Sequence, residues 1–335
     1  MAPARGSSGR DPRRSSRSGR AAAAAGRSGR PARSGGSGGA GRRAGPPPTR
    51  RTPGSRPVRP IPSEQRGGLG RSSSRDRSRD RRRTVGGDQV EGRQAVRELL
   101  LVGRRAVREV WIASDAEAAP ILADIRELAE AARVPIREVG RAKFAAQARC
   151  EAPQGVLALA APLPEVALDD LIGGRTAVPF LVALDGVTDP GNLGAILRSA
   201  ECAGATGVIL PRHRAVHVTP AATKAAAGAI EHLPITLVGG LPAALAGLRK
   251  DGVLVVGLDG AAERSLYDLP PADGPVCLVL GAEGRGLSRL VRERCDETVA
   301  IPLRGRLGSL NVAAAAALAS FEIARHRPPA GQRRS

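Results

Sequence analysis

Residues 180–211 read FLVALDGVTDPGNLGAILRSAECAGATGVILP, and this stretch decides the fold class. An uncharged apolar run, FLVAL, ends at Asp185, a helical segment follows the turn TDPGN, and a second apolar run, GVILP, comes next. Short apolar strands that alternate with helices are typical of a parallel sheet covered on both faces. The stretch therefore predicts a strand–helix–strand unit of an α/β domain.

The same alternation continues to the C-terminal end of the domain. The segments are, in order, TPAATKAAAGAI, LPITLV, LPAALAGLRKDG, VLVVGLDG, VCLVLGAEG, LSRLVRERC, TVAIPL and LNVAAAAALASFEIARHR. We expect a doubly wound parallel-sheet domain over residues 179–327. In such sheets ligands bind beyond the carboxyl ends of the strands, so the candidate functional residues are those that follow each strand.

A smaller α/β unit is predicted upstream, over residues 85–162. A helical pattern in VEGRQAVRELLLVGRR precedes a strand-like VREVWIA, a helical ILADIRELAEAARV, the strand VPIREV, the helical AKFAAQARC and the strand QGVLALAAP. We expect residues 163–178 to link this unit to the larger domain.

The first 84 residues differ from the rest in charge and composition. They contain 23 Arg, no Lys and four acidic residues, so this segment carries +19 of the net charge of +20. Because it is built from Arg, Gly, Ser and Pro, it has too few apolar residues to offset the entropy of ordering, and we expect a disordered tail, as at residues 328–335. A flexible polycation binds phosphate backbones through counterion release, which favours nucleic acid as a partner. The alternative is a solvated tail that reflects a high-GC genome.

The sequence argues against a metal-binding protein and against a membrane protein. The four cysteines are far apart and form no CxxC pair, and the histidines show only the weak spacing His213/His217, so we expect neither disulfides nor a metal. No apolar h-region follows the N-terminal arginines and no run of about 18 apolar residues exists. We therefore expect a cytoplasmic protein with no membrane contact.

Three sequence blocks carry candidate chemistry, and the first is LDGVTDPGNLGAILRSA. Asn192 follows the turn and Arg198 lies six residues later in the predicted helix. For an arbitrary α/β protein, Asn192 would be a helix N-cap and Arg198 a surface cation.

The second block is LVLGAEGRGLSRL, in which a strand runs directly into Gly281, Glu283 and Gly284. Glycines let a ligand approach the backbone closely. The spacing differs from the G-x-G-x-x-G of dinucleotide sites, and a carboxylate in the loop would repel a pyrophosphate. A cationic ligand without phosphate, of which S-adenosyl-L-methionine (SAM) is one, suits the loop better. A tight strand-to-helix turn is the alternative.

The third block is IPLRGRLGSLNVAAAAALASFE, where Ser309 and Asn311 stand just ahead of an Ala-rich helix. Either residue can serve as a simple N-cap. The alanines allow this helix to pack closely, against the core or against a neighbouring subunit.

Together, the blocks DPGNLGAILRSA, LVLGAEGRGLS and IPLRGRLGSLNVAAAAALASFE resemble, in order and spacing, the signature blocks of the SpoU (TrmH) branch of the SPOUT methyltransferases. The resemblance spans residues 180–327. Upstream, VEGRQAVRELL and Gln154-Gly155 resemble the small L30e-like substrate-binding domain of 23S rRNA guanosine 2′-O-methyltransferases. One departure is Ala152-Pro153, where members often have His, and it weakens the choice of subgroup.

The resemblance implies a SAM-dependent RNA ribose 2′-O-methyltransferase with a trefoil knot, acting as a homodimer on 23S rRNA or a pre-ribosomal particle. The implied catalytic residues are Arg198, Asn192, Glu283, Ser309 and Asn311. The implied cofactor-binding residues are Gly281, Gly284, Ile301, Leu303 and Leu310.

In the family, the residue at the position of Arg198 is credited with activating the hydroxyl. Arginine is protonated throughout the accessible pH range, so orienting a phosphate and the hydroxyl costs less than acting as a base. Two other RNA methylases stay open, one that modifies tRNA and one that confers antibiotic resistance. From another class, a non-catalytic RNA-binding or ribosome-assembly factor is also open, although such a relative would be expected to lose Arg198 or Glu283.

Overall fold

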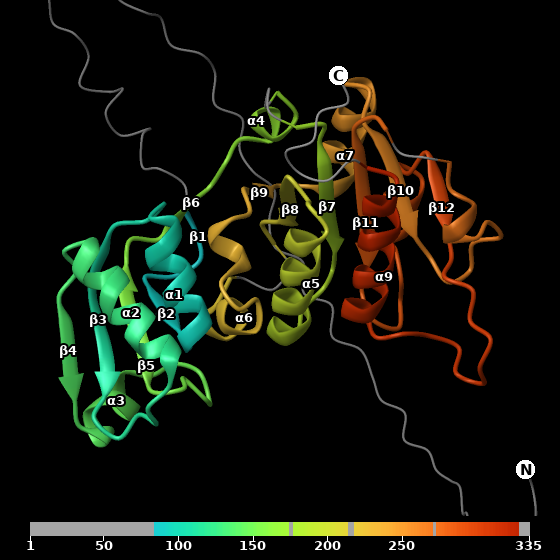
Figure 1. Ribbon diagram of the computed structural model, residues 1–335. Coiled ribbons are helices and arrows are strands. Elements are labelled where there is room, and N and C mark those ends of the chain that lie inside the picture. The colour runs from blue at the N-terminus through green and yellow to red at the C-terminus, as the bar shows by residue number, and fades with distance from the viewer. Residues whose placement is uncertain (1–83, 174–176, 214–217, 271–272, 328–335) are drawn as a thin grey trace, which may run out of the picture. The chain divides into compact units, whose positions relative to one another are not determined.

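The computed structural model describes residues 84–173, 177–213, 218–270 and 273–327 (Figure 1). The predicted tail falls outside these residues except for Thr84, which begins strand β1, Thr84–Val85. The predicted C-terminal tail also lies outside them. In the described part, no helix is long and apolar enough to cross a membrane.

The upstream α/β unit forms the elements that the sequence predicts, with one extra strand. Its four-stranded sheet has the order β2-β5-β3-β4, and only β3 and β4 run parallel. The elements are β2 (Gln89–Glu91), α1 (Arg93–Val102), β3 (Val107–Ala113), α2 (Pro120–Ala131), β4 (Ile136–Val139), α3 (Arg141–Gln147) and β5 (Val156–Ala160). The extra strand is β2, whose three residues are too few to show a period of two.

The segment predicted as a linker, residues 163–178, contains regular structure. Strand β6 (Leu163–Pro164) pairs with β1 in an antiparallel ladder, and helix α4 (Leu168–Ile172) follows. Leu163 and Leu171 are buried, so apolar packing orders a stretch whose sequence shows little periodicity.

The second sheet has six parallel strands, as predicted, in the order β12-β10-β11-β7-β8-β9. Its elements are β7 (Phe180–Asp185), α5 (Pro190–Cys202), β8 (Gly207–Pro211), α6 (Pro220–Ala225), η1 (Ala229–Glu231), β9 (Ile235–Val238), α7 (Leu241–Lys250), β10 (Leu254–Leu258), η2 (Leu266–Asp268), β11 (Val276–Gly281), α8 (Arg289–Arg292), β12 (Glu297–Val299) and α9 (Val312–Arg325). Helices α6 and α8 are shorter than the sequence patterns predict.

Helices cover both faces of this sheet. Side chains of α5, α6 and α9 form one core with the sheet, and those of α4, α7 and α8 form another; Figure 1 shows α5 and α9 in front of the same strands. The neighbouring strands β7 and β11 thus lead to helices on opposite faces, α5 and α8. At such a switch point the connections diverge and open a crevice at the carboxyl ends of the strands.

One buried ion pair joins the two sheets. Arg105, which follows α1, contacts Glu231 of η1 at 2.9 Å, and neither side chain is more than 4% exposed. The other guanidinium nitrogens of Arg105 donate to the carbonyl oxygens of Ala161 and Gly87. The two sheets therefore share a hydrogen-bonded contact as well as a chain connection.

Candidate active site

The β7–α5 connection places Asn192 at the carboxyl edge of the sheet. Asp189 is the N-cap of α5, since its carboxylate accepts a hydrogen bond of 2.7 Å from the Asn192 backbone N–H. Pro190 occupies the first helical turn, where its missing N–H costs nothing. Asn192 is therefore not the cap, and its side-chain amide is free to contact other elements.

The β11–α8 connection folds back tightly on its own strand. Ala282 and Gly286 exchange two backbone hydrogen bonds, and a Cβ atom at Gly281 would lie 2.2 Å from the Gly286 carbonyl carbon. Gly284 and Gly286 have φ of +75° and +65°, which side chains disfavour. Gly281 is thus required by the loop itself, and its contact with a cofactor stays a prediction. Glu283 lies in this turn, and its side chain is exposed.

Asn311 begins α9 and also contacts the other two blocks. Its side-chain oxygen accepts hydrogen bonds from the backbone N–H groups of Ala313 and Ala314, which makes it the N-cap. Its Nδ2 donates to Asn192 Oδ1 at 3.0 Å and to Glu283 Oε1 at 2.9 Å. Asn311 therefore has both roles that the sequence suggested: it caps α9, and it contacts the other two blocks.

Asn192, Glu283 and Asn311 form a closed hydrogen-bonded triangle, which we call the amide–carboxylate cluster. The third side is the hydrogen bond of 2.8 Å from Asn192 Nδ2 to Glu283 Oε1. Glu283 Oε1 therefore accepts from two amides, and among the described residues Oε2 has no hydrogen-bond partner. The cluster presents a carboxylate oxygen, fixed in orientation, to a ligand that can donate a hydrogen bond.

Two predicted catalytic residues do not join this cluster. Arg198 lies on the exposed side of α5, and six residues at about 100° each place it roughly a third of a turn away from the row of Asn192. Ser309 is exposed in the segment before α9. Neither side chain makes a hydrogen bond or ion pair within the described part of the chain, so both remain available to an external group.

The predicted cofactor-binding residues are divided between the β11 turn and the segment of residues 301–310. Leu303 and Leu310 are exposed apolar side chains, and Ile301 is half-buried. Among the described residues, no hydrogen bond of any backbone or side-chain group in 301–310 is found. This segment therefore carries free N–H and C=O groups beside apolar side chains, the set that an adenosine moiety needs, and it fits SAM.

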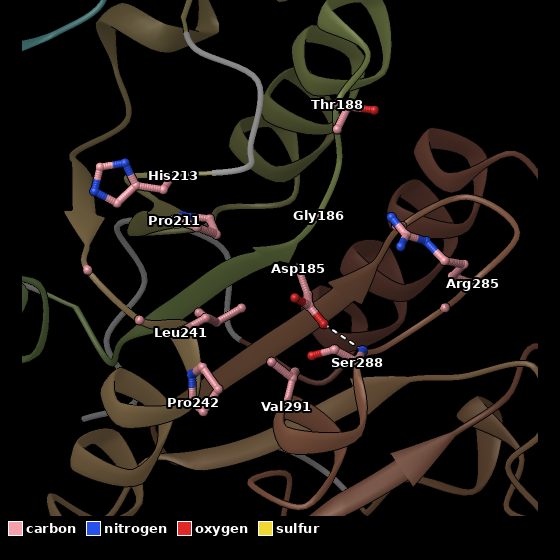
Figure 2. Close-up of a pocket in the computed structure, with 14 residues that line it drawn as sticks. Asp185, Gly186, Thr188, Pro211, His213, Leu241, Pro242, Arg285, Ser288 and Val291 are labelled. Atoms are coloured by element: carbon pink, nitrogen blue, oxygen red, sulfur yellow. Dashed lines mark hydrogen bonds between the residues drawn. The ribbon is translucent and has the colours of Figure 1, made fainter. Parts of the chain in front are cut away.

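A cavity of about 800 Å³ opens at the carboxyl ends of β7, β8 and β9 (Figure 2). Asp185 stands in it, and its Oδ2 accepts a hydrogen bond of 2.6 Å from the Ser288 backbone N–H. None of the residues that line the cavity was predicted from the sequence as a site residue. A signal was available, because Asp185 ends β7, and ligands bind beyond the carboxyl ends of the strands in such sheets.

The four cysteines are free thiols. Burial, together with the nearby carboxylates of Glu91 and Asp296 respectively, raises the pKa of Cys150 and of Cys295 to about 11. Both are therefore protonated at neutral pH and poor nucleophiles. Across the described residues, no three His, Cys, Asp or Glu side chains gather in a way that could hold a metal ion. His217 lies outside those residues.

The chain matches two families in the order that the sequence predicts. Residues 179–321 match the SpoU rRNA Methylase family, and residues 89–166 match the family described as RNA 2′-O ribose methyltransferase substrate binding. A 23S rRNA (guanosine-2′-O-)-methyltransferase, RlmB, of Pseudomonas putida is 38% identical over 243 residues, which cover 72% of this chain and 97% of the relative. This chain belongs to the SpoU rRNA methylase family. The resemblance to this family that the three sequence blocks showed is confirmed.

Solved structures of SpoU proteins share the fold. The methyltransferase AviRb of Streptomyces viridochromogenes, in complex with the cofactor AdoMet, is 29% identical with a TM-score of 0.60, covering 77% of this chain and 94% of that one. An AdoMet-bound rRNA methyltransferase of Sinorhizobium meliloti is 27% identical with a TM-score of 0.57, covering 75% and 90%. The six-stranded parallel α/β domain of this chain is therefore a SpoU-type domain.

Proposed function

We propose that this protein transfers the methyl group of SAM to the ribose 2′-hydroxyl of a guanosine in 23S rRNA. The observation that carries the proposal is the amide–carboxylate cluster, in which the three sequence blocks meet around one open carboxylate oxygen, Glu283 Oε2. The names of the RlmB relatives support the substrate, and the AdoMet complexes of SpoU structures support the methyl donor.

Residues 301–310, with Gly281 and Gly284 of the β11 turn, would hold SAM. Bound there, SAM supplies an electrophilic methyl group on a sulfonium. The uncharged backbone groups and leucines of 301–310 suit an adenosine, and the carboxylate of Glu283 nearby in the β11 turn suits a cation better than a pyrophosphate. Hydrogen exchange tests this assignment: SAM should slow exchange in 301–310 far more than in β8 or β9, whereas equal slowing would refute it.

The polar side chains would orient the RNA. Glu283 Oε2 accepts a hydrogen bond from the ribose hydroxyl, and the amides of Asn192 and Asn311 hold that carboxylate in place. Arg198 uses its guanidinium fork to bind a substrate phosphate and so positions the hydroxyl. Ser309 adds a hydroxyl beside them.

We further infer that the protein is a homodimer. Four side chains on or just before α9 are exposed although they are apolar: Leu310, Ala314, Leu318 and Phe321. Ala314, Leu318 and Phe321, spaced by four and three residues, lie on one stripe of α9, and Leu310 precedes the N-cap. Such a stripe suits a self-complementary two-fold contact. Light scattering combined with the methylation assay tests this, and a fully active monomer would refute it.

The same proposal includes the domain limits, the knot and the cellular location. Domain limits of 85–162 and 179–327, an L30e-like upstream domain and a trefoil knot accord with the two family matches. The strand order β12-β10-β11, which carries the chain past β10 before α9 packs beside α5, supports the knot. We include a cytoplasmic location and a pre-ribosomal substrate in the proposal, and the 23S rRNA substrate supports both.

Mapping of ribose methylation tests the function. A deletion strain should lose one 2′-O-methylguanosine of 23S rRNA, and the purified protein with SAM should restore it on rRNA from that strain. Loss of methylation from tRNA alone would replace the proposal with the tRNA enzyme. If no RNA position changes and the protein still binds rRNA, it is a non-catalytic factor.

A further inference from the structure

The cavity beside the amide–carboxylate cluster has a lining suited to a nucleobase. Pro211, Leu241, Pro242 and Val291 supply apolar surface, and Asp185 supplies a carboxylate (Figure 2). No residue of 301–310 lines it. The cavity is therefore separate from the segment that fits SAM, and it is large enough for a second ligand.

Asp185 is oriented by the chain and keeps one oxygen free. The Ser288 N–H donates to Oδ2 at 2.6 Å, while Oδ1 has no hydrogen-bond partner among the described residues. Figure 2 shows the carboxylate between the β7 strand end and Ser288, with His213 and Arg285 on either side of it in this view. An ionised carboxylate accepts hydrogen bonds and donates none, so this group selects a ligand with donors.

Guanine is the RNA base that matches such an acceptor. Its N1–H and its N2 amino group are adjacent donors on the Watson–Crick edge. Adenine and cytosine place a ring-nitrogen acceptor beside their amino group, and uracil flanks its single N–H with two carbonyl oxygens. Proteins that read unpaired RNA commonly form hydrogen bonds to this edge of the base.

The cavity and the amide–carboxylate cluster share two connections of the chain. Ala282 lines the cavity and is the immediate neighbour of Glu283, at a Cα–Cα distance of about 3.8 Å. Thr188 lines the cavity as well and precedes the cap of the helix that carries Asn192. A base held in the cavity would therefore leave its ribose close to Glu283.

We propose that this cavity holds the guanine of the nucleotide to be methylated and that Asp185 reads its N1–H and N2 amino donors. The inference rests on the proposed function and adds to it the residue that selects guanosine. His213 and Arg285 line the same cavity and would face the phosphates on either side of the base.

The test replaces the target guanosine by inosine, which lacks the N2 amino group. Methylation is first mapped on 23S rRNA with the wild-type protein, and RNA carrying guanosine, inosine or adenosine at that position is then assayed. A site built to bind a donor rejects the analogue without it, so inosine should lower kcat/KM about tenfold or more. Equal kcat/KM for guanosine and inosine overturns the proposal, as does a mapped target other than guanosine.

The variant Asp185→Asn tests whether Asp185 itself reads the base, when it is assayed on the same three RNAs. Its amide oxygen can still accept from the Ser288 N–H, while its amino group replaces the free acceptor. Methylation of guanosine should fall, the penalty for inosine should vanish, and adenosine should gain relative to guanosine. An inosine penalty that persists in this variant refutes the role of Asp185.

The matched control is Asp251→Asn, at an exposed carboxylate at the far end of α7 that makes no side-chain contact in the described part of the chain. It should retain wild-type discrimination. Thermal unfolding checks that Asp185→Asn folds, and the inosine comparison in the wild type needs no variant. If the wild type methylates no RNA at all, the proposed function fails, and this result differs from methylation without discrimination.

Discussion

Two glutamates of this molecule show how surroundings decide what a carboxylate does. Glu231 is 1% exposed and is paired with the buried cation of Arg105. Glu283 is exposed, is held by the neutral amides of Asn192 and Asn311, and keeps one oxygen open. A buried, ion-paired carboxylate is committed to the fold, whereas an exposed one that is oriented by uncharged donors can bind a substrate.

The largest expected effect is on stability, from Arg105→Met. The variant leaves Glu231 buried without its cation, which typically costs about 3–5 kcal/mol. Burial raises the pKa of Glu231 above its usual 4.5, even beside Arg105. A carboxyl whose pKa is higher when folded loses stability as pH rises through that pKa, so the deficit should be smaller at about pH 5 than at about pH 8.

Urea unfolding of the single variant and of Arg105→Met/Glu231→Leu measures this effect. The double variant should recover much of the loss, because no charge is left buried. If the single variant unfolds within about 1 kcal/mol of the wild type, Glu231 is not committed to the fold and the contrast with Glu283 fails.

Arg198→Ala should have the next largest effect, on activity. The side chain has no partner within the described residues, so its removal should spare the fold and lower kcat about 100-fold or more, as loss of a transition-state contact does. SAM affinity, measured by calorimetry, should change little. Arg198→Lys should fail too, since an ammonium lacks the guanidinium fork. Lys250→Ala is the control for loss of an exposed cation, and near-normal turnover of Arg198→Ala would contradict the role.

Glu283→Gln and Glu231→Gln compare the two glutamates directly. A glutamine oxygen at position 283 can still accept from Asn192 and Asn311, so the melting temperature should hold while kcat falls about 10- to 100-fold with the loss of a charged acceptor. Glu231→Gln should lower the melting temperature instead and leave kcat of the folded fraction unchanged. If both variants changed the melting temperature and kcat in the same way, the two glutamates would not differ in role.

Asn311→Ala should give the smallest effect on stability. Loss of the α9 cap costs about 1 kcal/mol, which lowers Tm by about 2–4 °C in a domain of this size. Asn311→Asp is the sharper companion, since its carboxylate can still cap the helix while it no longer donates to Glu283 and places a like charge beside it. It should keep the Tm and lose activity; full activity in Asn311→Asp would show that the cluster does not act through Glu283.

Local patterns in the sequence predicted most of the elements. Apolar runs predicted the six strands of the parallel sheet, β7 to β12, because a buried parallel strand needs a nearly continuous apolar run. The pattern missed β2 and the structured segment that contains α4, where too few residues repeat. It also predicted α8 to be longer than it is, since tertiary packing rather than helix propensity decides where so short a helix ends.

The site was predicted in part. Asn192, Glu283 and Asn311 were expected to act together, and they form the amide–carboxylate cluster. Arg198 and Ser309 are exposed and have no partner in the described residues, so their roles stay predictions. Neither the Asp185 cavity nor the Arg105–Glu231 pair was predicted, because the family resemblance names none of these residues and spacing along the chain does not show which distant residues meet.

The sequence by itself determined the fold class, the family and the three blocks, since these depend on residue type and spacing along the chain. Tertiary structure decided the strand order, which sets β10 and β11 beside β7 and so brings position 192 within hydrogen-bonding distance of 283 and 311. It also decided which of two glutamates is buried with a cation and which stays open. The periodicity of a segment shows which of its residues are buried. Which strands lie side by side depends instead on how all the elements pack around one core.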